Sequence, residues 1–312
     1  MKLIRGIKNL KQQFKKSVLT IGIFDGVHLA HQKIIKKVVR QAKALKGTSM
    51  VATFHPHPLR TLSSSAATPM ISSLEHRIDL ISRLNVDVCL LLDFNKEFSR
   101  MCAEDFIKDI LVDAVGINCL ILGKGFRFGK ERKGTFALLK KLSKTYGFNV
   151  RRIEPVKING EIISSSKIRA LIQKGKIKEA NKFLGRAFSI FGKVKKGNAR
   201  GRVLGYPTAN ITPLQEIVPL AGVYAVKVLT DNKIFPGVLN IGCRPTFTRK
   251  LPCAHTIETH IFNFHNKIYG KRLEVFFIQR IRPEKKFATH KALLAQIKKD
   301  EVKAKKILTP KI

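Results

Sequence analysis

The sequence predicts two domains of different class: an α/β domain with a doubly wound, Rossmann-like parallel sheet, followed by a small antiparallel β-barrel that ends in a helix. In the first half, short apolar runs alternate with segments of helical spacing. From about residue 187, short alternating runs separated by Gly and Pro replace them. The chain has 312 residues, which is long for one core and ordinary for two. We therefore expect domains at 1–186 and 187–312.

Strands and helices alternate through the first half. Strands are expected at 18–21, 49–54, 86–92, 118–122 and 148–153, and helices at 28–42, 74–84, 103–115 and 136–146. This rhythm favours a parallel sheet with helices on both faces, and such sheets bind ligands at the carboxyl ends of their strands. The loops at 22–32, 55–58 and 123–130 each follow a strand. We expect them to share one rim and to form a site.

A glycine-containing turn leads from the first of these strands into a helix. His28 and His31 stand at the helix start, three residues apart and therefore on the same side. A helix start offers unpaired N–H groups and a partial positive charge, which favour an anion. The histidine pair would suit a triphosphate.

Two other interpretations of this pair compete with phosphate binding. A His-x-x-His pair also occurs in metal sites, but no third ligand follows at a useful spacing, and Asp25 is the only nearby carboxylate. An ordinary turn with solvated histidines explains the local sequence about as well as phosphate binding does. Motifs further along the chain are needed to choose between these interpretations.

A second anion site is expected near residue 165. The three serines at 164–166 precede a helical pattern, so one of them is expected to cap a helix. Together with Lys167 and Arg169, their hydroxyls also form a second anion cradle. A further helix is expected at 177–184, ending at Gly185.

The second half has the pattern of a small antiparallel barrel. Short alternating runs occur at 188–194, 222–229, 234–241, 255–263 and 273–281. The segment 289–308 is a Lys-rich amphipathic helix, for which Leu293, Leu294 and Ile297 are the expected apolar anchors.

One loop and one carboxylate of the second half are candidates for phosphoryl chemistry. Thr208 and Asn210 offer hard oxygen ligands that suit Mg²⁺, although a plain Gly/Pro loop would explain this stretch better if it stood alone. Alternation places Glu258 on one strand face with Thr256 and His260. A carboxylate within a strand is costly unless it is paired or functional. It can accept the proton of an attacking hydroxyl.

Charge and cysteine content limit the class of protein. The chain has 60 basic and 21 acidic residues, a net charge of +39, which attracts polyanions. The basic residues are spread from end to end, so compositional bias is the favoured explanation, and no specific nucleic-acid or membrane partner is expected.

Five cysteines without a Cys-x-x-Cys pair suggest neither disulfides nor zinc. The expected location is the cytoplasm, because no apolar run reaches ~18 residues and no secretory signal is recognised. The oligomeric state is left open.

Several motifs together resemble a known family. Gly-x-Phe-Asp-x-x-His-x-x-His at 22–31, followed by Ser-Ser-Ser-x-Ile-Arg at 164–169, resembles the adenylyltransferase superfamily. With Gly-x-Gly-Phe-Arg-Phe-Gly at 123–129, the first half is similar to the FAD synthetase half of prokaryotic bifunctional riboflavin kinase/FAD synthetase. The second half resembles the riboflavin kinase module in the ordered segments 205–210, 222–225, 240–247, 256–262, 269–271 and 281–287.

The resemblance implies two reactions. Riboflavin is phosphorylated by ATP to FMN, and FMN is then adenylylated by a second ATP to FAD, with release of pyrophosphate. It implies Mg²⁺ as cofactor, held by Thr208 and Asn210, and Glu258 as the base toward the ribityl hydroxyl. The FMN phosphate is already anionic, so adenylyl transfer needs charge stabilisation, from the histidine pair and Arg169, rather than a base.

The resemblance also implies a set of binding residues. In the front domain they are Gly22, Phe24, Asp25, Gly26, Ser164, Ser165 and Ser166 for ATP, and His57, Pro58, Gly123, Phe126, Arg127 and Phe128 for the flavin; in the kinase nucleotide loop they are Gly201, Gly205 and Pro207.

Four positions depart from the usual family pattern. Ala30 stands where Gly is usual, His55 where Glu is common, Gly125 where Asp or Asn is normal, and Ser166 where Thr is usual. An alternative function is therefore riboflavin kinase alone, with an adenylyltransferase half weakened by Ala30 and Gly125. A remote alternative is a basic nucleic-acid-binding protein, which would require binding with a steep salt dependence.

Overall fold

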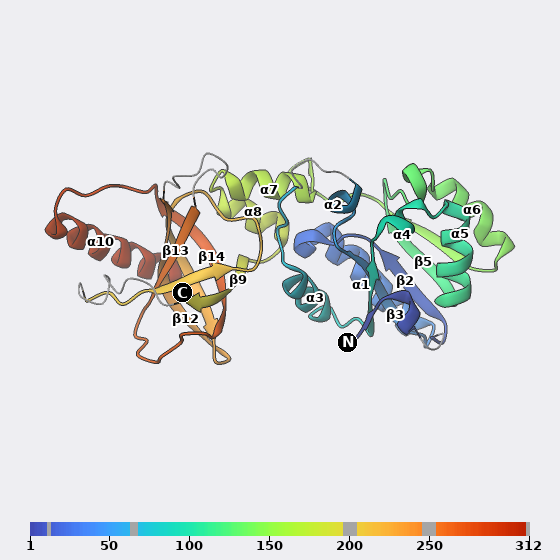
Figure 1. The fold of residues 1–312 in the computed structure, drawn as a ribbon, viewed down its shortest axis with the longest axis horizontal. Helices are drawn as coiled ribbons and strands as arrows, with labels where there is room; N and C mark the ends of the chain where they lie inside the picture. Colours follow the sequence, from blue (N-terminus) through green and yellow to red (C-terminus); the bar gives the residue numbers. More distant parts are fainter. Residues whose placement is uncertain (11–13, 63–67, 196–204, 245–253, 310–312) are drawn as a thin grey trace. The chain divides into compact units, whose positions relative to one another are not determined.

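The computed structural model describes residues 1–10, 14–62, 68–195, 205–244 and 254–309 (Figure 1). It divides into two compact units, Met1–Thr68 with Leu74–Ser164 and Pro69–Ser73 with Ser165–Ile312. The helices that follow Ser164 group with the barrel because Asn181 bonds to it: its side chain donates to the Phe277 carbonyl (2.9 Å) and accepts from the Phe188 N–H (2.7 Å). The domain boundary at 186/187 remains a prediction.

The first unit contains a parallel sheet of six strands in the order β1-β4-β3-β2-β5-β6. The strands are β1 (Lys2–Arg5), β2 (Ser17–Ile21), β3 (Ser49–His55), β4 (Val88–Asp93), β5 (Ile117–Gly123) and β6 (Asn149–Ile153). Every neighbouring pair is parallel, which confirms the predicted sheet. The short edge strand β1 was not predicted, because four residues with two basic side chains carry little strand pattern.

Helices and turns connect these strands. They are η1 (Ile7–Asn9), η2 (Asp25–Val27), α1 (Leu29–Ala44), α2 (Pro58–Leu62), α3 (Leu74–Ser82), α4 (Lys96–Arg100), α5 (Ala103–Asp105), η3 (Phe106–Ala114), η4 (Lys130–Arg132) and α6 (Phe136–Thr145), with a small hairpin of β7 (Lys157–Ile158) and β8 (Glu161–Ile162). The helix predicted at 103–115 differs from expectation: after one α-helical turn it continues as the π-helix η3. Its apolar residues Phe106, Ile107, Ile110 and Leu111 are nevertheless buried.

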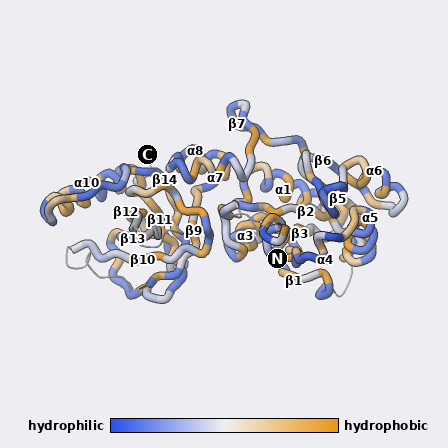
Figure 2. Tube along the Cα trace, turned by 45° about the horizontal axis from the view of Figure 1, so that its top comes forward, coloured by the Kyte–Doolittle hydropathy of each residue, from blue (hydrophilic) through white to orange (hydrophobic). Residues whose placement is uncertain are grey.

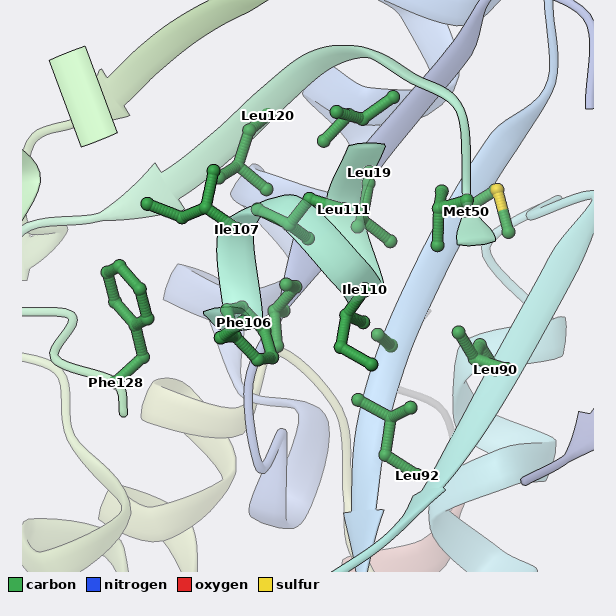
Figure 3. Packing of buried hydrophobic residues seen from close by; sticks show 14 of the residues in the cluster. Leu19, Met50, Leu90, Leu92, Phe106, Ile107, Ile110, Leu111, Leu120 and Phe128 are labelled. Atoms are coloured by element: carbon green, nitrogen blue, oxygen red, sulfur yellow. The ribbon is translucent and has the colours of Figure 1, made fainter. Parts of the chain in front are cut away.

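Both faces of the parallel sheet are covered. On one face, Leu19 and Met50 belong to the hydrophobic cluster that includes Phe106 and Ile107 of η3 (Figure 3). On the other face, the adjacent strand residue Val18 packs in a cluster with Val38 of α1. Because successive strand residues point to opposite faces, this division confirms the doubly wound arrangement.

The second unit contains a closed antiparallel barrel in the order β10-β13-β12-β11-β14-β9, as predicted. Its strands are β9 (Phe188–Lys195), β10 (Ala209–Pro213), β11 (Gly222–Thr230), β12 (Lys233–Arg244), β13 (Ala254–Ile261) and β14 (Arg272–Arg282), and its helices are α7 (Ser165–Gln173), α8 (Ile177–Leu184) and α10 (His290–Leu308). Strand β10 was not predicted, because the Gly/Pro-rich sequence before it was interpreted as a loop that included Asn210.

The C-terminal helix α10 forms where predicted but is held differently. Hydrophilic and hydrophobic positions alternate along it (Figure 2). Its buried residues are Asp300 and Ala304. The predicted anchors Leu293 and Ile297 are only partly buried and line a cavity instead, and Leu294 is also partly buried. The fully buried positions of this helix are thus Asp300 and Ala304, whereas Leu293, Leu294 and Ile297 contribute partial burial.

Two composition-based expectations can be compared with the structure. Cys89 and Cys119 are buried free thiols, as expected, and Cys102 is free as well. Among the residues that the structure describes, no helix has the length and hydropathy of a membrane span.

Candidate functional site

The turn after β2 has an unusual backbone. Phe24 and Val27 have φ of +53° and +39°, a left-handed conformation that non-glycine residues seldom adopt, and Gly26 has φ of +75°. A Cβ at Gly22 would lie 3.1 Å from the Phe24 ring, so this glycine allows the ring to fold over the turn. Such backbone conformations concentrate at functional sites.

His28 and His31 lie together at the start of α1, as predicted. The Nδ1 atom of His28 accepts a long hydrogen bond (3.4 Å) from the His31 N–H and so caps the helix. A neutral His28 therefore carries its proton on Nε2, where it can donate to a ligand. The two rings are stacked, with centroids 3.6 Å apart and planes 18° apart.

His31 is electrostatically unusual. Its Nδ1 is buried and makes no hydrogen bond with the described residues. Burial first, then the neighbouring His28 and Arg77, hold the pKa of His31 well below its usual value. The imidazole is therefore neutral near pH 7, and a neutral imidazole still has one N–H to donate.

Arg77 of α3 is a component of this site that the sequence analysis missed. The residue is 2% exposed. Its Nη1 donates to the Ile23 carbonyl (2.8 Å) and its Nη2 to the Phe54 carbonyl (3.0 Å). Burial lowers the pKa of Arg77, and the charge of Asp25 opposes that shift. A signal was present, because Arg77 occupies the apolar stripe of its helix between Leu74 and Ile81.

The departure at Ala30 is accommodated locally. Ala30 lies in the first turn of α1, where the backbone is helical. A Cβ is compatible with that backbone, so Ala30 does not disturb the helix start.

The loop after β5 lines a cavity of about 250 Å³. Of the predicted flavin residues, Gly123, Phe126 and Arg127 line it, whereas Phe128 is 8% exposed and packs on Phe106 at 5.3 Å. The other lining residues are Leu122, Gly125, Thr135, Phe136, Ala137 and Arg152.

His57 and Pro58 do not line this cavity. They follow β3, and the His57 Nδ1 accepts a hydrogen bond from the Leu59 N–H (3.1 Å) at the start of α2. Because β3, β2 and β5 are neighbouring parallel strands, their carboxyl ends share one rim, as predicted.

A row of phenylalanines crosses this rim and was not predicted as part of the site. Ring centroids lie 5.7 Å apart between Phe54 and Phe94, 5.6 Å between Phe94 and Phe98, and 6.1 Å between Phe98 and Phe106. Phe54, Phe94 and Phe98 are partly exposed, so they offer apolar faces to a planar ligand. Phe54 and Phe94 stand at the ends of β3 and β4, which was the available signal, whereas Phe98 lies on α4.

The serine cluster lies at a helix start, as predicted. Helix α7 begins at Ser165, directly after Ser164, and includes Ser166 and Arg169. It belongs to the second compact unit. The assignment of these residues to phosphate binding stays a prediction.

In the barrel, Glu258 lies between two asparagines. On β13 it stands opposite Asn210 of β10 and opposite Asn240 of β12. Directly opposed residues share one face of a sheet, so the carboxylate is flanked by two amides on the same face. Asn210 was predicted for this site, although in a loop rather than a strand. Asn240 was not predicted, because only the register between β12 and β13 places it opposite Glu258.

A second cavity, of about 270 Å³, opens beside Glu258. Predicted Thr208 lines it, together with Tyr206, Val223, Val238, Asn240, His260, Arg282, Glu284, Lys285, Phe287, Leu293, Ile297 and Asp300. The Nδ1 of His260 lies 2.8 Å from the Pro207 carbonyl oxygen, which fixes the loop before Thr208 to β13. Gly205 adopts φ of +78°, whereas Gly201 lies outside the described residues.

The oxygen donors of the barrel suit a hard divalent cation. Thr208 supplies a hydroxyl, Asn210 an amide oxygen and Glu258 a carboxylate, which are the ligand types that Mg²⁺ accepts. Among the described residues, no group of three or more His, Cys, Asp or Glu side chains is arranged to hold a metal ion.

Fold and sites together define a two-part transferase, with a Rossmann-like unit that presents a helix start and a histidine pair, and a barrel that presents a carboxylate between amides. The FAD synthetase family model matches residues 10–167 and the riboflavin kinase family model matches residues 184–308. The chain belongs to the bifunctional riboflavin kinase/FMN adenylyltransferase family.

Similar proteins cover the whole chain. Bifunctional riboflavin kinase/FMN adenylyltransferases from Buchnera aphidicola subsp. Schizaphis graminum and from Escherichia coli K12 are 41% and 36% identical to it, over 96% and 98% of this chain and 96% and 97% of theirs. A crystal structure described as a macrolide-efflux protein from Streptococcus pneumoniae is also similar (TM-score 0.87, 30% identity), covering 98% of this chain and 99% of that one.

Proposed function

We propose that this chain carries out both reactions named for its family: phosphorylation of riboflavin to FMN, and adenylylation of FMN to FAD. The observation that carries the proposal is that the two units hold chemically different sites. The barrel has a carboxylate suited to activating a hydroxyl, whereas the Rossmann-like unit has donors suited to phosphates and no carboxylate–nucleophile pair among its predicted site residues.

In the kinase step, Glu258 accepts the proton of the ribityl hydroxyl as that hydroxyl attacks the γ-phosphorus of ATP; the bond from this phosphorus to the β–γ bridging oxygen breaks and ADP leaves. The flanking amides of Asn210 and Asn240 orient the carboxylate. Thr208 and Asn210 would hold Mg²⁺, which neutralises phosphate charge when bound. The apolar part of the cavity, with Val223 and Val238, accommodates the ring of riboflavin.

In the adenylyl-transfer step, the FMN phosphate attacks the α-phosphorus of a second ATP and pyrophosphate leaves. His28 and His31 donate N–H groups to the phosphates, and the start of α1 adds its backbone N–H groups. The turn residues at 22–26 shape this cradle. The serines at 164–166 and Arg169, around the start of α7, bind phosphate.

The flavin of this second step lies on the rim of the parallel sheet. Gly123, Phe126 and Arg127 bind it from the loop after β5, and His57 and Pro58 bind it from the end of β3. The partly exposed phenylalanines of this rim provide the stacking surface for its ring system.

The proposal includes domain limits, location and partners. The adenylyltransferase domain is 1–186 and the kinase domain 187–312. The enzyme works in the cytoplasm, where the buried free thiols of Cys89 and Cys119 suit a reducing compartment. Its partners are the small molecules riboflavin, FMN and ATP. The net charge of +39 reflects composition rather than nucleic-acid binding.

A time course tests the proposal. The purified chain is incubated with riboflavin, ATP and Mg²⁺, and the flavins are separated at intervals. We expect FMN to appear first and FAD to follow, and FMN supplied directly to give FAD. Accumulation of FMN without FAD in both experiments would show the kinase-only alternative. No flavin product, with salt-sensitive DNA or RNA binding instead, would favour the nucleic-acid alternative.

A further inference from the structure

Arg77 is a buried cation to which the proposed mechanism assigns no step. Its guanidinium joins the carbonyl groups at the ends of two neighbouring strands, Ile23 after β2 and Phe54 on β3. We propose that Arg77 is a positioning residue of adenylyl transfer, which fixes the turn that carries the histidine pair against the end of β3. This inference rests on the proposed placement of ATP at that turn.

The path from Arg77 to the histidines is short. The Ile23 carbonyl accepts two hydrogen bonds, one from Arg77 (2.8 Å) and one from the Thr53 hydroxyl (3.0 Å). The next residue, Phe24, has the left-handed backbone that turns the chain, and its ring meets the His31 ring edge to face, with centroids 5.2 Å apart. A shift of the Ile23 carbonyl would therefore displace the ring against which His31 packs.

The shape of the guanidinium matters for this role. A planar fork can place two N–H groups on two carbonyl oxygens in fixed directions, whereas a lysine ammonium keeps the charge but not that geometry. The Arg77 Nε is buried without a hydrogen bond among the described residues. Arg77 therefore binds the strand ends through its two terminal nitrogens, Nη1 and Nη2.

The charge of Arg77 acts on the same site. It faces Asp25 of η2 and His31 of α1, with His28 stacked on His31. At the end of β3, burial first and then the charge of Arg77 lower the pKa of His55, with Arg60 and Arg5 acting in the same direction and Asp93 in the opposite one. A fixed positive charge beneath the turn favours a bound polyphosphate.

Two substitutions in the full chain distinguish the effect of the guanidinium geometry of Arg77 from the effect of its charge. Arg77→Met removes both, and Arg77→Lys keeps the charge. For Arg77→Met we expect kcat/KM for ATP in FMN adenylylation to fall by about 10-fold to 100-fold, as small misplacements of reacting groups do. Arg77→Lys should regain part of the loss. Riboflavin kinase activity of the same molecules should stay within about twofold of wild type, since the kinase site lies in the other unit.

A matched control and a spectroscopic readout exclude a merely structural effect. Arg83→Met removes an exposed arginine directly after α3, which pairs with Asp79 at 2.7 Å, and should leave adenylylation unchanged. The C2 proton of His31, followed by NMR, should titrate at higher pH in Arg77→Met because a nearby positive charge is gone. Wild-type adenylylation in Arg77→Met, or an unchanged His31 titration, overturns the inference.

Two further comparisons cover the case in which Arg77→Met does not fold and test the proposed placement of ATP separately. If Arg77→Met does not fold, Arg77→Lys and Thr53→Val decide: reduced adenylylation in either, with normal kinase activity, supports the inference, and wild-type rates in both overturn it. His28→Ala tests the underlying placement of ATP. If His28→Ala still makes FAD, that placement fails; if His28→Ala loses FAD formation while Arg77→Met keeps it, only the role of Arg77 fails.

Discussion

Asp300 of α10 forms a buried ion pair with Arg282 of β14. The Arg282 Nε donates to both carboxylate oxygens (3.0 and 2.9 Å), and its Nη2 lies 2.8 Å from Oδ2. The Gln296 amide donates to the same carboxylate (2.9 Å), whose side chain is 6% exposed. Both charged residues line the kinase cavity. An ion pair and the buried Ala304 therefore fix the part of α10 that lines this cavity at Asp300.

Removing this carboxylate should destabilise the barrel and weaken riboflavin binding. Asp300→Ala leaves Arg282 without its partner in a largely buried place, a change that typically costs about 3–5 kcal/mol. We expect a lower urea midpoint for the second unit and a higher KM for riboflavin. Glu301→Ala, one residue on, breaks the more exposed pair with Lys305 (2.6 Å) and should cost below ~1 kcal/mol. Equal effects of the two substitutions would contradict the assigned role of the buried pair.

Glu258→Gln should stop riboflavin phosphorylation and spare FMN adenylylation. The amide keeps the size and the neighbours of the carboxylate but cannot accept the proton of the attacking hydroxyl. Loss of a general base commonly costs about 10²–10⁴ in rate. The measurement is FMN formation from riboflavin, with FAD formation from added FMN as the control on the same sample. Equal loss of both products would argue against separate sites.

Gly125 and Gly129, two glycines of the loop after β5, allow the effect of a close contact on stability to be measured. Gly125 and Gly129 both have positive φ, +84° and +69°, so alanine at either position is strained by about 1–3 kcal/mol. Gly129 also has ψ of 177°, a backbone region that is essentially restricted to glycine. A Cβ at Gly125 would meet no atom within 4 Å, whereas one at Gly129 would lie 2.8 Å from the Ala103 Cα. Gly129→Ala should therefore lower the melting temperature of the first unit more than Gly125→Ala does. Gly125→Asn should cost least, since asparagine tolerates this backbone. A melt of each variant ranks the three, and the reverse order would refute the contact.

Acid should destabilise the first unit through His31. Its folded pKa lies well below the usual value, so below about pH 6.5 the unfolded chain binds a proton that the folded chain does not. Stability then falls as pH drops from 6.5 toward the folded pKa, and no such effect remains above 6.5. His31→Gln should flatten this part of a plot of urea midpoint against pH. His290→Gln, a substitution of the same type in the second unit, provides the control for the first unit.

The histidine pair and Glu258 could be found from sequence because each depends on local pattern. The spacing of His28 and His31 on a helix start places them on one side whatever surrounds them, and the strand alternation fixes the face of Glu258. Arg77 and Asn240 were missed for a different reason. Their roles depend on which strand ends and which registers come together, and no local pattern contains that information.

Local sequence pattern was enough to predict the two classes of domain, most of their strands and helices, and the residue types that we propose for the phosphates and for a hydroxyl. These follow from hydrophobic periodicity and from Gly and Pro positions, which act over a few residues. The tertiary structure decided that Glu258 lies between Asn210 and Asn240, that Arg77 joins the ends of β2 and β3, and that Asp300 holds α10. These are contacts between residues distant in the chain, and only packing and strand register bring them together.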